Sequence, residues 1–134
     1  MNTQKTILIV EDEKDIREAL RDVLENNQYL VLEAKNGKEG VTAALEHHPD
    51  LILLDLLMPE MDGMAALTTI RSDVWGKDAP VIILTNLNAN NEHLVADVVS
   101  HKPLYYLIKS DWNIGDVLKK IEETLNVSSE ALTH

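Results

Sequence analysis

The sequence predicts an α/β domain in which helices cover both faces of a doubly wound parallel sheet. Three observations carry this prediction. Short apolar runs alternate with segments whose apolar residues recur at helical spacing, this alternation repeats five times, and turn residues separate the units. Runs such as that at 7–10 are typical of strands that are buried on both faces. The five predicted strands cover residues 7–10, 30–34, 51–54, 81–84 and 104–108.

The first two helices have clear start and stop signals. Acidic residues at 12–15 suit the positive end of the first helix dipole, and two asparagines at 26–27 end that helix. The second helix follows a turn at 36–37 and ends near Pro49, because the residue before proline disfavours helical backbone. The apolar residues that mark these helices are Ile16, Ala19, Leu20, Val23 and Leu24, and then Val41, Ala44 and Leu45.

Three more helices follow the later strands. A loop at 58–63 contains proline and glycine and precedes the third helix, and an asparagine-rich loop at 86–91 precedes the fourth. Their apolar residues are Met64, Leu67 and Ile70 in the third helix, Leu94, Val95, Val98 and Val99 in the fourth, and Ile114, Leu118, Ile121 and Leu125 in the fifth. We therefore expect one domain over residues 1–134, with a core of about 6–125 and a frayed tail at 126–134.

The composition excludes several classes of function. The chain of 134 residues has 12 basic and 23 acidic side chains and a net charge of −11. This charge argues against binding nucleic acid or an anionic membrane surface, since both need clustered basic residues. The absence of cysteine excludes disulfides, thiolate zinc sites and a cysteine nucleophile. No apolar stretch is long enough for a membrane span or a signal peptide, so we expect a cytoplasmic protein.

Chemically reactive side chains follow four of the five predicted strands. They are Glu11 and Asp12 after the first strand, Asp55 after the third, Thr85 after the fourth and Lys109 after the fifth. The carboxyl ends of parallel strands meet at one edge of the sheet, and ligands bind where the strand order reverses. We therefore expect these side chains to converge.

Such a group of side chains suits phosphoryl transfer. Three neighbouring carboxylates repel one another, and a hard divalent cation such as Mg²⁺ relieves the repulsion. An ammonium from Lys109 and a hydroxyl from Thr85 complete a cradle for a phosphoryl group. Attack on phosphorus by one of the carboxylates would give an aspartyl phosphate.

Taken together, these motifs resemble the receiver domains of response regulators in two-component signalling, including the chemotaxis receivers. The resemblance runs from about Thr6 to Leu125. It rests on ILIVEDE at the first strand, LILLDLLMPEMDG around Asp55, VIILT ending at Thr85 and YLIK ending at Lys109, in the family's order and at its intervals. It implies a flavodoxin-like (βα)5 fold with strand order 2-1-3-4-5.

The resemblance also implies a metal centre and a phosphoacceptor. Asp55 looks like the phosphoacceptor. The implied Mg²⁺ ligands are Asp12 and Asp55 directly, Glu11 through water, and the backbone carbonyl of Leu57. Because Leu57 contributes only its carbonyl, its apolar side chain is compatible with this role.

Three further residues match the family's switch. Thr85 and Lys109 are implied to contact the phosphoryl oxygens. Tyr106 matches the aromatic residue that turns inward when the threonine moves. These movements change how the face around the fourth helix, fifth strand and fifth helix binds partners, which is a shift in population between two arrangements.

The chain departs from the family pattern at several positions. Asn86 stands where a small residue is usual, and we expect its larger side chain either to narrow access to Asp55 or to hydrogen-bond to the phosphoryl group. Ser110 stands where proline is usual, and a cis bond before it would cost roughly 3 kcal/mol more than trans. The glycine usual before the fifth strand is replaced at 101–103. Leu57 and Leu87 occupy positions that tune phosphoryl lifetime, and neither side chain can orient a water molecule, so we expect slow dephosphorylation.

The resemblance implies a signalling module that turns over no external substrate. Its partners would be a sensor histidine kinase or a histidine phosphotransfer protein, and an unknown downstream protein. With no output domain in the sequence, we expect a stand-alone receiver, although a phosphorelay intermediate and a piece of a longer regulator remain open. Two other functions compete. One is a phosphorylation-independent interaction module, and the other is an aspartyl-phosphate phosphatase, which Leu57 disfavours because that class has a second aspartate there.

Overall fold

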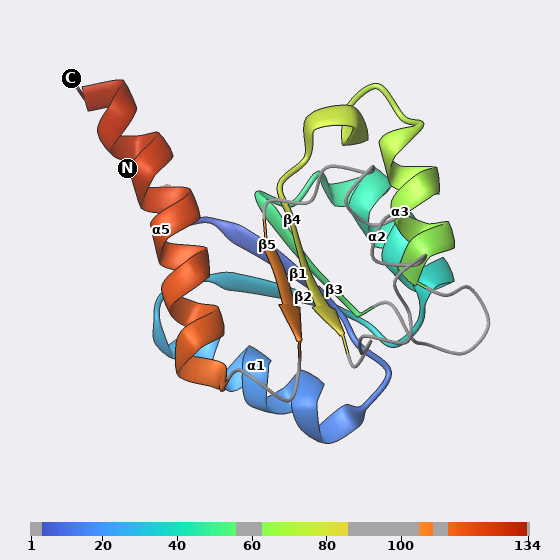
Figure 1. The fold of residues 1–134 in the computed structure, drawn as a ribbon, viewed down its shortest axis with the longest axis horizontal. Coiled ribbons are helices and arrows are strands. Elements are labelled where there is room, and N and C mark those ends of the chain that lie inside the picture. Colours follow the sequence, from blue (N-terminus) through green and yellow to red (C-terminus); the bar gives the residue numbers. More distant parts are fainter. Residues whose placement is uncertain (1–3, 56–62, 86–104, 109–112, 134) are drawn as a thin grey trace.

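The structure is a computed structural model that describes residues 4–55, 63–85, 105–108 and 113–133 (Figure 1). Its strands are β1 (Thr6–Val10), β2 (Leu30–Ala34), β3 (Leu51–Asp55), β4 (Val81–Thr85) and β5 (Tyr105–Ile108). Its helices are α1 (Lys14–Asn26), α2 (Gly37–His47), α3 (Gly63–Arg71), the 3₁₀ helix η1 (Gly76–Asp78) and α5 (Ile114–Thr133). The fourth predicted helix, around 94–99, lies outside the described residues.

The strands form one parallel sheet in the order β2-β1-β3-β4-β5. This order confirms the flavodoxin-like fold that the sequence predicted. Every residue of β3 is buried, and so are residues 7–10 of β1, as expected for central strands covered on both faces. The strand order reverses between β1 and β3, so a ligand crevice is expected at their carboxyl ends.

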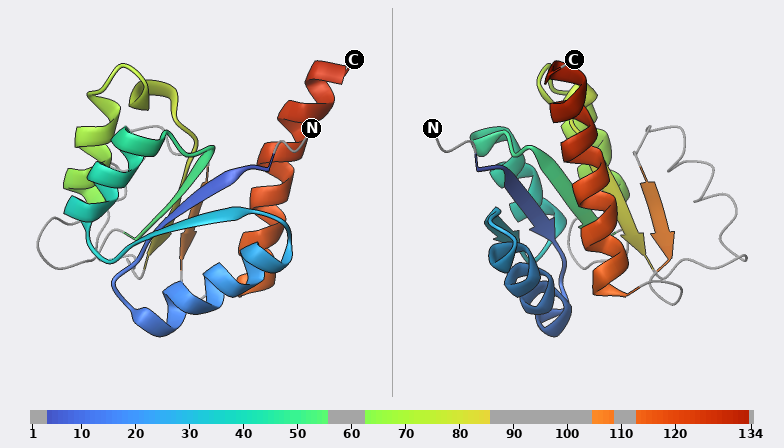
Figure 2. Two further views of the ribbon diagram at one scale, coloured as in Figure 1. Left: turned by 180° about the vertical axis from the view of Figure 1, so that it is seen from behind. Right: turned by 90° about the vertical axis from the view of Figure 1, so that its left-hand side faces the viewer.

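Helices cover both faces of this sheet in the described part of the chain (Figures 1 and 2). One face carries α1 and α5, and the other carries α2 and α3. Because successive strand residues point to opposite faces, β1, β3 and β4 each contribute buried residues to both cores. The core under α1 and α5 contains Ile7, Ile9, Leu20, Leu24, Leu51, Leu53, Ile82, Leu84, Val117, Ile121 and Leu125. The core under α2 and α3 contains Leu8, Val10, Ala34, Ala44, Ile52, Leu54, Ala66, Leu67, Ile70, Val81 and Ile83.

The C-terminal end of α1 is closed by a Schellman motif. The amide of Tyr29 donates to the Leu24 carbonyl at 3.1 Å, and the amide of Gln28 donates to the Glu25 carbonyl at 3.1 Å. Gln28 takes the left-handed position of this motif, with φ of 74°, where glycine is the usual residue. The motif turns the chain directly into β2.

The N-terminal end of α2 is capped by Asn36. Its side-chain oxygen accepts a hydrogen bond of 2.8 Å from the amide of Glu39, and the Glu39 carboxylate accepts one of 3.2 Å from the amide of Lys35. This arrangement resembles a capping box, and the bond to Asn36 satisfies one of the amides that the first helical turn leaves open. The predicted turn at 36–37 is therefore the start of α2.

The predicted tail is wrong for residues 126–133. Helix α5 continues past Leu125 to Thr133, and its last turns project beyond the sheet (Figures 1 and 2). The polar composition of this segment suggested fraying. However, it contains no proline or glycine to end the helix, and extending an existing helix adds one hydrogen bond per residue without a new nucleation cost. Within the described ranges, no helix has the length and apolar character needed to cross a membrane.

Candidate metal centre

Two of the predicted acidic residues lie in the turn between β1 and α1. The amide of Glu11 donates to the carbonyl of Ala34 in β2 at 3.0 Å, which extends the β1–β2 hydrogen bonds by one residue. The Glu11 carboxylate then accepts a hydrogen bond of 3.1 Å from the amide of Glu13. Glu11 is buried, with 1% of its surface exposed, whereas Asp12 is only half-buried. The turn therefore presents both carboxylates at the carboxyl edge of the sheet.

The third acidic residue, Asp55, is the last residue of β3. It is 3% exposed and pairs in register with Leu84 of β4, the residue before Thr85. On its other side, β3 pairs with β1, and the last paired residue of β1, Val10, lies opposite Leu54. Asp55 and Glu11 therefore follow paired residues of adjacent parallel strands, and their side chains emerge at the same level of the sheet.

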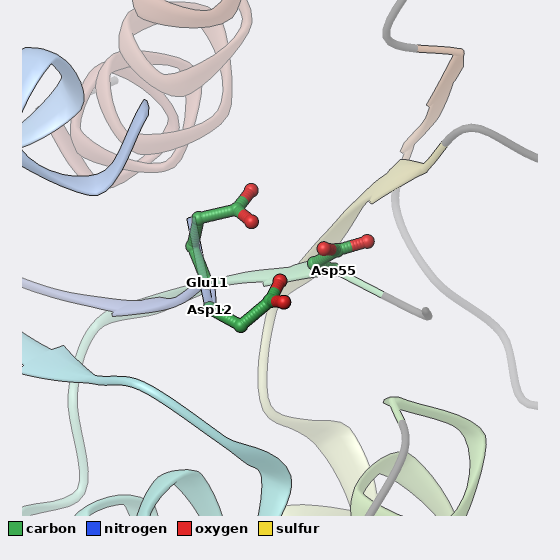
Figure 3. Close-up of side chains that lie close together, drawn as sticks. All are labelled: Glu11, Asp12 and Asp55. Atoms are coloured by element: carbon green, nitrogen blue, oxygen red, sulfur yellow. The ribbon is translucent and has the colours of Figure 1, made fainter. Parts of the chain in front are cut away.

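The carboxylates of Glu11, Asp12 and Asp55 form one cluster (Figure 3). One oxygen from each residue lies within 4.8 Å of the others. Two full charges at that separation repel by about 3 kcal/mol at an effective dielectric constant of 20. Three ionised groups therefore need a nearby positive charge to remain together.

The donor set of this cluster fits a hard divalent cation. It offers carboxylate oxygens only, which Mg²⁺ prefers over nitrogen or sulfur, and Mg²⁺ usually takes one or two carboxylates and keeps several waters. Asp12 is the most exposed of the three residues, so the cluster is open to solvent on its side. The predicted convergence of Glu11, Asp12 and Asp55 is thus what the structure contains.

The other predicted site residues are placed only in part. The backbone of Thr85 ends β4 at the same edge of the sheet and pairs with Ile108, the residue before Lys109. Tyr106 lies in β5 and pairs with Ile83. Four predicted residues lie outside the described ranges, namely Leu57, Asn86, Leu87 and Lys109, and Ser110 lies outside them as well.

One residue beside the cluster was not predicted from the sequence. Arg17 of α1 donates from its guanidinium Nη1 to the Glu11 carbonyl oxygen at 2.9 Å, and its Nε lies 3.4 Å from Glu33 Oε1. The sequence gives no indication of this contact, because Arg17 is simply a basic residue of a helix six positions after Glu11.

Comparison with known proteins gives the same assignment. The family model described as response regulator receiver domain matches residues 7–122. The chain is 35% identical over 121 residues to the chemotaxis protein CheY of Bacillus subtilis, covering 90% of this chain and 97% of CheY. It is 42% identical over 105 residues to the transcriptional regulatory protein YdfI of Bacillus subtilis, covering 77% of this chain. That match spans 47% of YdfI, so the chain corresponds to about half the length of that relative.

A solved structure extends the comparison. The crystal structure of the phosphorylated cyanobacterial phytochrome response regulator RcpA superposes with a TM-score of 0.76 at 31% identity, and the match covers 90% of this chain and 93% of RcpA. Fold, acidic cluster and sequence relatives agree, and the chain belongs to the response regulator receiver domain family.

Proposed function

We propose that this receiver domain accepts a phosphoryl group on Asp55 from a phosphohistidine donor, in a reaction that needs Mg²⁺. The observation that carries the proposal is the burial of Asp55 within 4.8 Å of the Glu11 and Asp12 carboxylates at the carboxyl edge of the sheet. Burying an ionised carboxylate costs free energy unless the group is hydrogen-bonded, paired with an opposite charge or coordinated to a metal ion. A cluster of three fits a cation and a transferred phosphoryl group.

The residues of the chain have distinct parts in this reaction. Glu11, Asp12 and Asp55, with the backbone carbonyl of Leu57, hold the metal ion. When bound, Mg²⁺ offsets the negative charge of the carboxylates and the phosphoryl oxygens. A carboxylate oxygen of Asp55 forms the new bond to phosphorus while the bond from phosphorus to the donor's histidine nitrogen breaks, and that nitrogen keeps the electron pair.

The remaining residues respond to the phosphoryl group. Thr85 and Lys109 contact its oxygens, and Tyr106 in the neighbouring strand follows the movement of Thr85. The resulting change in a protein-binding face is the output. Asn86 limits access to Asp55, while Leu57 and Leu87 leave the attacking water unoriented and lengthen the lifetime of the phosphoryl group.

The biological setting follows from this chemistry. The donors are a sensor histidine kinase or a histidine phosphotransfer protein, and the output is binding of a downstream protein in the cytoplasm. Residues 1–134 act as one receiver unit that modifies itself and turns over no external substrate. Nucleic acid and membranes are not expected partners, because the net charge of −11 repels both.

The proposal is tested by phosphorylation with a small donor. The protein is incubated with Mg²⁺ and acetyl phosphate or phosphoramidate, and its intact mass is measured beside an Asp55→Asn variant. We expect one added phosphoryl group in the wild-type protein and none in the variant. A folded protein that binds Mg²⁺ poorly and ignores both donors and beryllofluoride would instead be a phosphorylation-independent interaction module.

A further inference from the structure

The guanidinium of Arg17 joins two elements that flank the acidic cluster. Its Nη1 donates to the carbonyl oxygen of Glu11 at 2.9 Å, and its Nε lies 3.4 Å from Glu33 Oε1 of β2. The side chain of Arg17 is 16% exposed and that of Glu33 is 31% exposed, so the bond to the Glu11 carbonyl is partly buried and the ion pair with Glu33 lies nearer the surface. Shielded, charge-assisted hydrogen bonds from a planar fork are both stronger and more directional than exposed ones.

The Glu11 carbonyl is an informative acceptor, because it belongs to the peptide unit that joins Glu11 to Asp12. A peptide unit is planar, so holding its carbonyl fixes the orientation of the whole plane. That orientation sets the backbone angles on both sides of the plane, and therefore the directions in which the two carboxylates leave the chain. One hydrogen bond from Arg17 thus acts on two of the three acidic residues.

Other contacts hold the same turn at its two ends. The Glu11 amide bonds to Ala34 of β2 at 3.0 Å, and the backbone amide of Arg17 bonds to the Glu13 carbonyl at 2.9 Å. The guanidinium holds the middle of the turn, because it donates to the carbonyl of the peptide unit between Glu11 and Asp12. Glu33 in turn is held from its other oxygen by Arg21 Nη1 at 3.4 Å.

We propose that Arg17 is a positioning residue for the metal centre: its guanidinium, braced by Glu33, orients the Glu11–Asp12 peptide so that both carboxylates stay within ligand distance of Asp55. This inference rests on the proposed function, because it takes the cluster to be a Mg²⁺ site. Arg17 itself ligates nothing. It acts through the backbone that carries two of the ligands.

The sign of the effect separates positioning from simple electrostatics. Arg17 is a cation close to a cation site, so on charge alone its removal would tighten Mg²⁺ binding. If it orients the ligands, its removal weakens binding, as loss of partners that orient metal ligands typically costs roughly 10- to 100-fold in affinity. The two accounts therefore predict opposite changes.

The experiment compares Mg²⁺ affinities of the wild-type protein, Arg17→Met, Arg17→Lys and Arg21→Met by calorimetry, without any phosphodonor. Methionine keeps the aliphatic stem and the helix propensity of arginine but removes its charge and hydrogen bonds. Arg21→Met is the matched control, since it removes an arginine of the same helix that also contacts Glu33 but not Glu11. Circular dichroism and urea unfolding establish that each variant is folded.

We expect Arg17→Met to bind Mg²⁺ about tenfold more weakly than the wild-type protein, and Arg21→Met to bind it with unchanged or slightly higher affinity. Hydrogen exchange at the Glu13 amide, which bonds to the Glu11 carboxylate, should accelerate in Arg17→Met and not in Arg21→Met. A purely structural role would lower the free energy of unfolding but leave the Mg²⁺ affinity of the folded protein unchanged.

Either of two results would overturn the role of Arg17 while leaving the metal centre itself intact. One is wild-type binding of Mg²⁺ together with equal or tighter binding by folded Arg17→Met. The other applies if Arg17→Met does not fold. Arg17→Lys then decides, because lysine keeps the charge and lacks the fork that reaches Glu11 and Glu33 together, and wild-type affinity in that variant excludes positioning. Failure of the wild-type protein to bind Mg²⁺ is distinguishable from both, since it overturns the metal centre itself.

Discussion

Gly40 of α2 lies against Val10 of β1 so closely that a Cβ at residue 40 would be 2.9 Å from both γ-carbons of Val10. Val10 is fully buried and its branched side chain has little freedom to move. Helix α2 can therefore approach the sheet at this point only because residue 40 lacks a side chain. Val10 is also the residue before Glu11, so this contact supports the strand end that carries the metal centre.

The first prediction is that Gly40→Ala destabilises the protein. Alanine gains about 1 kcal/mol of helix propensity, but overpacking a core costs about 1–3 kcal/mol, so we expect a net loss of about 1 kcal/mol. Urea unfolding measures the difference. Thr42→Ala, on an exposed position of the same helix, is the control and should be neutral or slightly stabilising. A more stable Gly40→Ala variant would show that α2 can move away from Val10 without cost.

The second prediction concerns Asp12, whose carboxylate adds repulsion to the cluster when no cation is bound. Asp12→Asn should raise the free energy of unfolding in EDTA by about 1 kcal/mol, since it removes one of three neighbouring charges and Asp12 is partly screened by solvent. The same variant should gain little stability from millimolar Mg²⁺, whereas the wild-type protein gains stability because the folded state alone binds the ion.

The control for this prediction is Asp15→Asn, an exposed acidic residue in the first turn of α1 outside the cluster. It should keep the wild-type response to Mg²⁺ and lose a few tenths of a kcal/mol through its weaker interaction with the helix dipole. Equal responses to Mg²⁺ in the Asp12→Asn and wild-type proteins would place the ion elsewhere.

The third prediction follows from the left-handed backbone at Gln28, where φ is 74°. A non-glycine residue in this region is strained by roughly 1–2 kcal/mol. Glycine avoids this strain, but its greater freedom in the unfolded chain offsets part of the gain in stability. Gln28→Gly should therefore stabilise the protein by up to about 1 kcal/mol in thermal or urea unfolding.

Asn27→Gly is the matched control at the neighbouring position. Its φ is −105°, and its side chain donates to the Val23 carbonyl at 2.8 Å, so glycine there removes a bond and relieves no strain. We expect this variant to be less stable than the wild-type protein. A destabilised Gln28→Gly variant would mean that the Gln28 side chain makes a compensating interaction.

The fourth prediction concerns the lifetime of the phosphorylated protein. Because Leu57 and Leu87 cannot orient an attacking water, we expect the phosphoryl group on Asp55 to persist for many minutes in the purified protein. Leu57→Asn, which introduces hydrogen-bonding groups two residues after Asp55 in the sequence, should shorten that lifetime severalfold, as followed by intact mass over time. A half-life of seconds in the wild-type protein would contradict this explanation.

Much of the fold could be read from local patterns. The strands at 7–10, 51–54 and 81–84 are uninterrupted apolar runs, and burial on both faces leaves such runs little alternative to a central parallel strand. The acidic cluster was predictable from the parallel arrangement of the strands. Parallel connectivity brings all strand ends to one edge, so residues such as Glu11 and Asp55 that follow strands must meet there.

Other features depend on contacts between distant segments. The end of α5 at Thr133 was missed because polar residues resemble a tail even where a helix continues. The need for glycine at residue 40 depends on Val10 of β1, which is thirty residues away in the sequence. The hydrogen bond from Arg17 to the Glu11 carbonyl could not be predicted from the sequence either. Arginines on helix surfaces are common, and few of them bind the backbone of a neighbouring turn.

Periodicity and strand-end chemistry, both properties of short stretches of chain, settle the type of domain, the position of each strand and the set of acidic residues that come together. The separation of the Glu11, Asp12 and Asp55 oxygens, and the side chains that orient them, depend on how α1, α2 and β2 pack around the end of β1. Close packing decides distances on the scale of a single atom, and no local pattern of residues records which partner will fill a given space.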